Sequence, residues 1–196
     1  PWTGWENALS AAGFIYFPPG YYSTLGATLT VATNTSAGSI VGSGADRCVI
    51  TVMADAPALK VTGTGGSPTV VTGFKLADIT FRAGVANTGP LLELDYLDSP
   101  AWRVENVILR PNGFACETAL YILDCQHGVI DNLSIRTSTG SDVFTTGVLI
   151  HADDSAQRGN ITFVGGIVNG ATTGVKFTST INSLNIRARS GLAGKK

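Results

Sequence analysis

Short alternating runs of apolar and polar residues recur along this chain at a nearly constant interval, and this repeat limits the possible folds more than any other feature. Five such runs begin 33, 28, 28 and 27 positions apart, at 59–62, 92–95, 120–123, 148–151 and 175–178. Alternation of this kind is typical of strands with one buried face. A period of a few tens of residues is typical of repeat architectures.

A second family of runs interleaves with the first and shares its period. Its members are 74–79, 102–107, 128–133 and, less regularly, 161–167. Each turn of chain then contributes at least two strands, which stack parallel on the next turn at about 4.8 Å per layer. The sequence therefore predicts an all-β fold, a right-handed parallel β-helix with coils of about 27 residues.

Composition agrees with this prediction. Only 14% of the 196 residues are charged and 44% are hydrophobic, and Gly, Thr, Ser, Val, Ile and Asn are abundant. Such a composition favours strands joined by tight turns over helices. A β-sandwich is the alternative, but it would show hairpin turns every ~8–12 residues and no fixed long period.

The start of the chain predicts one short helix. Thr3 and Glu6 have capping-box spacing, and Gly13 provides a left-handed stop. The helix over 4–12 would have an apolar face that caps one end of the solenoid. We expect a single domain over 1–196, with the cap over 1–13, coils over 14–188 and a C-terminal tail over 189–196.

Several classes of function are disfavoured by charge and by cysteine content. The net charge is −1 with both signs interleaved, so we expect neither a nucleic-acid partner nor a membrane partner. The three cysteines, Cys48, Cys116 and Cys125, form no CxxC pair and are interpreted as small buried apolar residues. We expect no metal and no cofactor. Pro18 and Pro19 interrupt the first twenty residues, which do not form the apolar stretch of a signal peptide, and this start is typical of a segment inside a longer protein.

One stretch resembles a known family. Residues 5–50 read WENALSAAGFIYFPPGYYSTLGATLTVATNTSAGSIVGSGADRCVI. This order of a helix, IYFPPGYY and IVGSG resembles the first coil of the pectate-lyase-like superfamily, and especially of bacteriophage tailspikes. Residues 74–188 are similar to the later coils in period and pattern.

The resemblance implies an extracellular protein of a virion tail, a homotrimer whose partner is a bacterial surface polysaccharide. The family contains hydrolases, lyases, esterases and adhesins without catalytic activity, so it indicates the fold more specifically than the activity. Two features depart from the family. No acidic, glycine-rich segment precedes the predicted helix, and no trimerisation domain follows 189–191. Both departures are expected for an excised piece or for a shortened relative of the family.

Strand alternation also predicts which side chains face outward. With Leu92 and Leu94 inward, Glu93 and Asp95 point outward. The same register gives two outward columns, Lys60, Glu93, Tyr121, Leu149 and Lys176 in the first, and Thr62, Asp95, Leu123, His151 and Thr178 in the second. The turn that follows carries Asp98, Asp124, Asp153 and Asp154.

These columns contain the candidate catalytic acids. Glycoside hydrolysis needs two carboxyl groups, and Glu93 and Asp95 would lie ~6.5–7 Å apart at the backbone. Tyr121 could stack on a sugar ring and His151 could transfer a proton. We expect Lys60, Lys176, Asp153 and Asp154 to complete the substrate-binding set. The alternative is that the acids only keep the outer face soluble.

Asp153 and Asp154 are also similar to the paired aspartates of polygalacturonase-like enzymes, but the other motifs of that mechanism are absent. They are the only nearby indication of a calcium-dependent lyase site.

The second strand family carries a candidate basic ladder. Arg82, Arg110 and Arg136 occupy corresponding positions. They could hold the carboxylates of an acidic polysaccharide, or form surface ion pairs with the nearby acids, which are Asp78, Glu105 and Asp131. Asn106 and Asn132 align with Asp78 and predict an inward amide ladder. Trp102 is predicted to lie in the core.

Three functional hypotheses follow. The first is a tailspike-like segment that recognises, and with Glu93 and Asp95 hydrolyses, a bacterial surface polysaccharide. The second is an adhesin or structural stalk without catalytic activity, and the third is a polysaccharide lyase. A catalytic site in coils outside this chain, or between protomers of a trimer, stays open.

Overall fold

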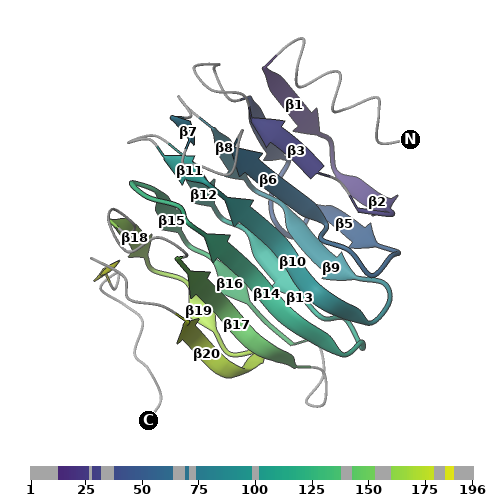
Figure 1. Ribbon diagram of the computed structural model, residues 1–196. Helices are drawn as coiled ribbons and strands as arrows, with labels where there is room; N and C mark the ends of the chain where they lie inside the picture. The colour runs from purple at the N-terminus through teal and green to yellow at the C-terminus, as the bar shows by residue number, and fades with distance from the viewer. Residues whose placement is uncertain are drawn as a thin grey trace.

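The computed structural model describes residues 13–26, 28–31, 38–63, 69–70, 74–98, 102–137, 143–152, 160–178 and 184–187, with the backbone alone at 28–31, 69–70 and 184–187. These residues form an all-β parallel solenoid of about five turns and contain no helix. The predicted solenoid of parallel strands is therefore confirmed (Figure 1). The helix predicted over 4–12 and the tail over 189–196 lie outside the described residues.

Three parallel sheets form the wall of the solenoid. Sheet A contains β1 (Phe14–Phe17), β4 (Ser39–Gly42), β8 (Lys75–Ala77), β12 (Arg103–Glu105), β15 (Val129–Asp131), β18 (Ile161–Val164) and β21 (Leu184–Arg187). Sheet B contains β2 (Gly20–Thr24), β5 (Cys48–Val52), β9 (Thr80–Ala83), β13 (Ile108–Arg110), β16 (Ser134–Ile135) and β19 (Ile167–Val168). Sheet C contains β3 (Thr28–Val31), β6 (Leu59–Gly63), β10 (Asn87–Asp95), β14 (Cys116–Leu123), β17 (Phe144–His151) and β20 (Ala171–Phe177).

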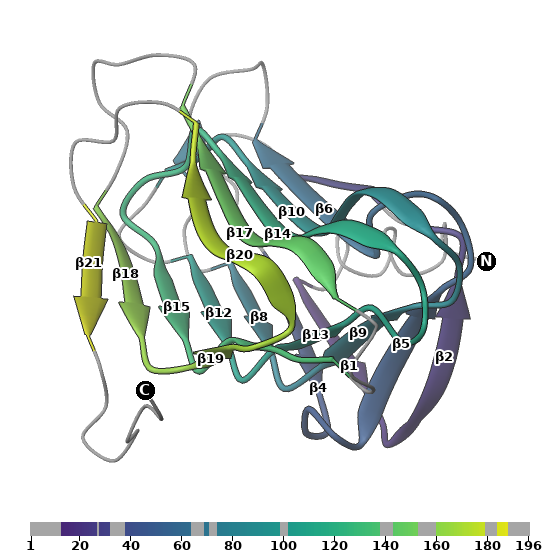
Figure 2. The same ribbon diagram turned by 90° about the horizontal axis from the view of Figure 1, so that it is seen from below.

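Each coil visits the three sheets in the order A, B, C. Figure 2 shows sheets A and C on separate sides of the coil. A short two-stranded sheet, β7 (Thr69–Val70) with β11 (Leu97–Asp98), lies between sheet C and the next strand of sheet A along the chain. The two strand families found in the sequence are sheets C and A. The sequence predicted at least two strands per turn. The structure has three, because each coil also contributes a strand to sheet B.

The register of sheet C agrees with the sequence period. Leu92 pairs with Leu59 in the preceding layer and with Leu120 in the following layer. Glu93 pairs in the same way with Lys60 and Tyr121. The column of Lys60, Glu93, Tyr121, Leu149 and Lys176 therefore exists as predicted.

The turn between sheets A and B depends on single residues in the left-handed region. Asp78, Asn106 and Asn132 have φ angles of 58°, 50° and 54°, a conformation that Asn and Asp tolerate better than most residues. Their side chains form a ladder, in which Asn106 Nδ2 donates to Asp78 Oδ1 (3.0 Å) and Asn132 Nδ2 donates to Asn106 Oδ1 (2.9 Å). The amide ladder was predicted to point inward, which is wrong. Asn106 and Asn132 are exposed because the left-handed turn directs their side chains to the outside.

The core between the sheets is apolar and closely packed. Trp102 is fully buried, as predicted, and its Nε1 donates to the carbonyl oxygen of Gln126 at 2.8 Å. The largest other buried side chains include those of Phe74, Phe81 and Phe144. Cys48, Cys116 and Cys125 are buried free thiols, also as predicted. Burial raises the pKa of both Cys48 and Cys116 to about 11.

The arginine ladder lies on sheet B with partners other than those predicted. Arg82 pairs in register with Arg110, but the ion pairs predicted with Asp78 and Glu105 are wrong. Glu105 instead contacts Lys75 Nζ at 2.5 Å and Arg103 at 2.9 Å. The hydrogen bond from Lys75, followed by that from Arg103, holds the pKa of Glu105 below its usual range despite partial burial.

Candidate functional site

The two predicted acids lie side by side on β10 and share one lysine. Lys60 Nζ, from β6, lies 2.8 Å from Glu93 Oε1 and 2.6 Å from Asp95 Oδ2. One ammonium group contacts both acids, so the carboxyl groups lie closer than the ~6.5–9.5 Å separation of inverting glycoside hydrolases. Lys60, predicted as a substrate-binding residue, is thus part of a compact ionic cluster.

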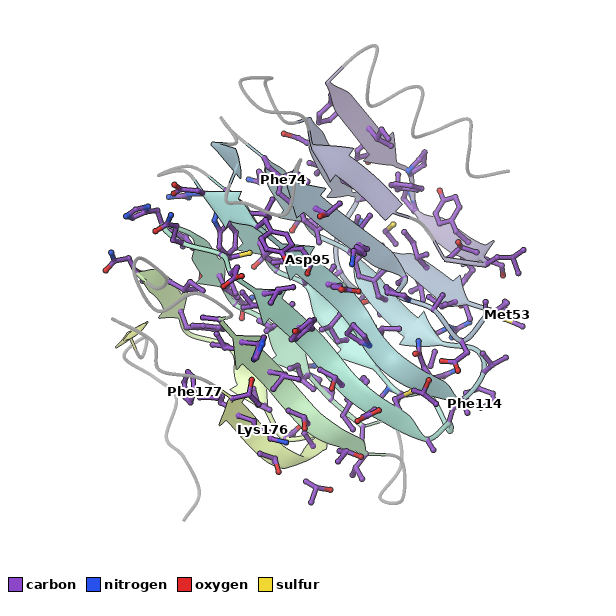
Figure 3. All side chains as sticks on the ribbon, viewed as in Figure 1. Met53, Phe74, Asp95, Phe114, Lys176 and Phe177 are labelled. Atoms are coloured by element: carbon purple, nitrogen blue, oxygen red, sulfur yellow. The ribbon has the colours of Figure 1, made fainter. Side chains whose placement is uncertain are left out.

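Asp95 is far less accessible than the alternation of the strand indicates. Its side chain is only 3% exposed, compared with 13% for Glu93 and 31% for Lys60. Thr62 and Leu123 flank it in the adjacent layers. The expectation that both acids are displayed to solvent is therefore wrong for Asp95, because alternation gives the face of a side chain but not its depth. Figure 3 labels Asp95 on the central layers of sheet C.

Burial changes the protonation of this group. It raises the pKa of Asp95 from 3.8 to about 6, although the hydrogen bond from Lys60 acts in the opposite direction. A hydrogen bond with Glu93 also favours the protonated form. The other oxygen of Asp95, Oδ1, is buried and has no hydrogen-bond partner among the described residues, which adds to the cost of the ionised form.

Lys60 is held in its charged form. Burial acts to lower its pKa, but the hydrogen bonds to Asp95 and then to Glu93 outweigh this effect and raise it. At neutral pH the cluster therefore contains a firmly protonated amine and two carboxyl groups. It can bind a polar ligand or transfer a proton from a carboxylic acid, but its lysine is unsuited to accept a proton.

A shallow groove adjoins the cluster along the outer face of sheet C. It has a volume of about 170 Å³ and is lined by the first half of β10, by β14 and by the neighbouring β17. Its lining residues are Thr88, Gly89, Pro90, Glu117, Thr118, Tyr121 and Leu149. Tyr121 belongs to both features, because it lines the groove and pairs with Glu93 across the sheet.

The remaining predicted site residues are not gathered here. His151 is two layers from Asp95 in the same column, and its Nδ1 contacts Thr178 Oγ1 at 2.5 Å. Lys176 is exposed on β20, three layers from Glu93, and is labelled at the C-terminal layers in Figure 3. Asp153 and Asp154 lie outside the described residues.

The structure also forms a polar cluster that the sequence analysis did not identify. Asp98 Oδ1 contacts His127 Nδ1 at 2.8 Å, and Asp98 Oδ2 accepts a hydrogen bond from Gln126 Nε2 at 2.9 Å. Asp98 and Gln126 are 28 positions apart and form a parallel bridge. The same repeat that aligns the strands could therefore have indicated this contact.

Within the described residues, no group of three or more His, Cys, Asp or Glu side chains is arranged to hold a metal ion. In the same part of the chain, no helix has the length and apolar character needed to cross a membrane.

Comparisons with protein-family models, with curated proteins and with solved structures found no match for this chain. The fold is therefore established by its own strand pairing, and activity has to be argued from the site.

Proposed function

We propose that this chain is a segment of an extracellular, tailspike-like protein that binds a bacterial surface polysaccharide along the outer face of sheet C. The proposal includes membership of the pectate-lyase-like superfamily, which the sequence of 5–50 resembles. It also includes the right-handed sense of the solenoid, because parallel crossover connections are right-handed in nearly all proteins.

The observation that carries the proposal is the groove beside Tyr121. Pockets that enclose a small molecule have volumes of ~300–1,000 Å³, whereas this open groove has about 170 Å³. Such a groove fits one unit of an extended polymer better than a whole small molecule. Its lining combines an aromatic ring, hydroxyl groups and a carboxylate, which are the groups that contact the faces and the hydroxyls of sugars.

The ionic cluster extends this surface across the strands, along the solenoid axis. Glu93 is in register with Tyr121, and Lys60 is in register with Glu93. A glycan chain lying along the column would meet the aromatic ring, then a carboxylate and then an ammonium group. Because the solenoid repeats its layers, Leu149 and Lys176 continue the same column toward β20.

Hydrolysis by Glu93 and Asp95 is the second candidate function. One observation favours it: the raised pKa of Asp95 and its hydrogen bond with Glu93 give one carboxylic acid beside another carboxyl group, the type of pair that glycosidases use. The burial of Asp95 and the bridging Lys60 oppose it, since a catalytic acid must reach the glycosidic oxygen. Binding without cleavage is therefore the better supported function.

Lyase chemistry has less support. A lysine that abstracts the proton next to a uronate carboxyl group has to be unprotonated, and the raised pKa of Lys60 keeps this amine protonated. Assembly as a homotrimer on a virion tail belongs to the proposal only through the sequence resemblance.

A panel of bacterial capsular and lipopolysaccharide glycans tests the proposal. Binding to the full chain is measured together with new reducing ends and unsaturated uronate absorbance, for the wild type and for Glu93→Gln. Binding without new ends supports the main proposal. New reducing ends that disappear in the Glu93→Gln variant would establish the hydrolase, and uronate absorbance would establish the lyase. A chain that binds no member of the panel contradicts the proposal.

A further inference from the structure

We infer that the outer face of sheet B is a second binding surface, which takes an anionic polysaccharide through a row of three arginines. This surface lies on a different sheet from the groove beside Tyr121. The inference is therefore independent of the function proposed for sheet C.

The solenoid places the three arginines in consecutive layers. Arg82 on β9 pairs in register with Arg110 on β13. Arg136 directly follows β16, and its backbone nitrogen donates to the Leu109 carbonyl oxygen at 3.1 Å, so it lies beside Arg110 in the next layer. Their backbones are therefore separated by about 4.8 Å per layer, and the three guanidinium groups form a row along the solenoid axis.

Neutral groups hold two of these arginines. Arg82 Nε donates to Thr51 Oγ1 at 2.7 Å, and its guanidinium lies over the Tyr21 ring at 5.5 Å from the centroid. Arg136 Nε donates to Ser134 Oγ at 2.5 Å. In the part of the chain that the structure describes, neither guanidinium contacts a carboxylate. Because Nε makes both bonds, the two terminal nitrogens of each group stay available for an anion.

The third arginine has only a weak acidic partner. Arg110 lies 3.2 Å from Asp46 Oδ1, and the Asp46 side chain is 76% exposed. Exposed ion pairs of this kind contribute little free energy to stability, and salt screens them. An incoming anion can replace Asp46 at small cost, so the row presents nearly three uncompensated positive charges.

The chemistry and spacing of the row favour a particular ligand. The guanidinium fork matches planar carboxylates and other oxyanions with two parallel hydrogen bonds. A row of single charges, one per layer, fits a linear polymer that carries acid groups at regular intervals. Duplex DNA, with one charge per ~1.7 Å of axis, would require a much more basic face than a chain of net charge −1 provides.

Affinity electrophoresis of the full chain tests this inference. The probes are polygalacturonate for carboxylates, dextran sulfate for sulfates, unmodified dextran as the neutral polymer and a short DNA duplex. The variants are Arg82→Gln, Arg110→Gln and Arg136→Gln, singly and together. Arg103→Gln on sheet A is the matched control, because it removes the same charge from a side chain that is 53% exposed on another face. Melting temperatures verify that each variant is folded.

We expect at least one acidic polysaccharide to bind, with a loss of about two- to fivefold in affinity for each arginine removed from the row and no change for Arg103→Gln. Binding to polygalacturonate would identify a carboxylate as the acid group of the ligand, and binding to dextran sulfate would identify a sulfate. An equal loss with Arg103→Gln, equal retardation by unmodified dextran, stronger binding to the DNA duplex, or no binding to either acidic polymer would overturn the inference.

Discussion

Asp95 shows how one residue can be predicted correctly in position and incorrectly in environment. The sequence period placed it beside Glu93 and on the outer side of its strand, and the register of β10 agrees. Its near-complete burial depends on the neighbouring layers, which alternation within one strand does not describe. The protonation of the candidate site could therefore not be predicted from the sequence.

The raised pKa of Asp95 makes stability depend on pH. Its pKa rises from 3.8 to about 6 on folding, so the folded state holds the proton more tightly, and the free energy of unfolding falls as the pH rises through this window. The contribution is as much as about 3 kcal/mol. Asn at this position cannot ionise. We expect Asp95→Asn to gain stability relative to the wild type between pH 4 and pH 7.5, as measured by urea unfolding. A difference between the two proteins that is constant with pH would contradict the assignment.

Gly128 is a second residue whose identity is fixed by packing. A Cβ atom built there would lie 1.8 to 2.2 Å from three ring atoms of Trp102, which is itself fully buried. We expect Gly128→Ala to destabilise the fold by about 1–3 kcal/mol in urea unfolding. Gly174→Ala is the matched control, because a Cβ there meets nothing within 4 Å. Equal unfolding midpoints for the two variants would show that the tight contact is wrong.

At the scale of elements, the sequence predicted some features of the turn from sheet A to sheet B and missed others. Aligning Asp78, Asn106 and Asn132 gave the ladder itself. The direction of the ladder follows from the left-handed backbone at each position, which the sequence alignment did not include. The separation of sheet B from sheet A was missed for a related reason, since the turns after β8, β12 and β15 are only two residues long and contain neither glycine nor proline.

Two substitutions at Asn106 separate the two contributions of this turn. Asn106→Gly removes the ladder hydrogen bonds but keeps the left-handed conformation accessible, at an expected cost of about 1 kcal/mol. Asn106→Ala removes the same hydrogen bonds, and because alanine tolerates a φ of 50° less well than asparagine or glycine, it should cost about 1–2 kcal/mol more than the glycine variant. Thermal and urea unfolding measure both. If the alanine variant is as stable as the glycine variant, the left-handed turn is not the constraint.

For the whole molecule, the period of the chain was enough to predict stacked coils and a shared apolar core. It was not enough to predict the groove beside Tyr121. The groove is lined by the first half of β10 together with β14 and β17, and the register between β10 and β14 shifts between Asn87 and Pro90. Such an irregularity has no clear signature in a repeat of alternating residues. The Asp98 cluster, in contrast, follows the period and was within reach of sequence reasoning.

The continuous core predicts the behaviour of the thiols. Cys48, Cys116 and Cys125 are buried, and burial raises the pKa of the first two to about 11. We expect none of them to react with an aromatic disulfide reagent in the native protein at pH 8, because the thiolate is the reactive form. All three should react quickly in concentrated urea. Rapid reaction of even one thiol without denaturant would argue against a continuous closed core.

The most direct test of the central claim, glycan binding on sheet C, is the affinity of Tyr121→Ala for a glycan that the wild type binds. Tyr16→Ala is the control, since Tyr16 is a 52% exposed tyrosine on β1 of sheet A. We predict that Tyr121→Ala weakens binding by about three- to tenfold while Tyr16→Ala leaves it unchanged. Unchanged binding by Tyr121→Ala, or an equal loss in both variants, would contradict the account.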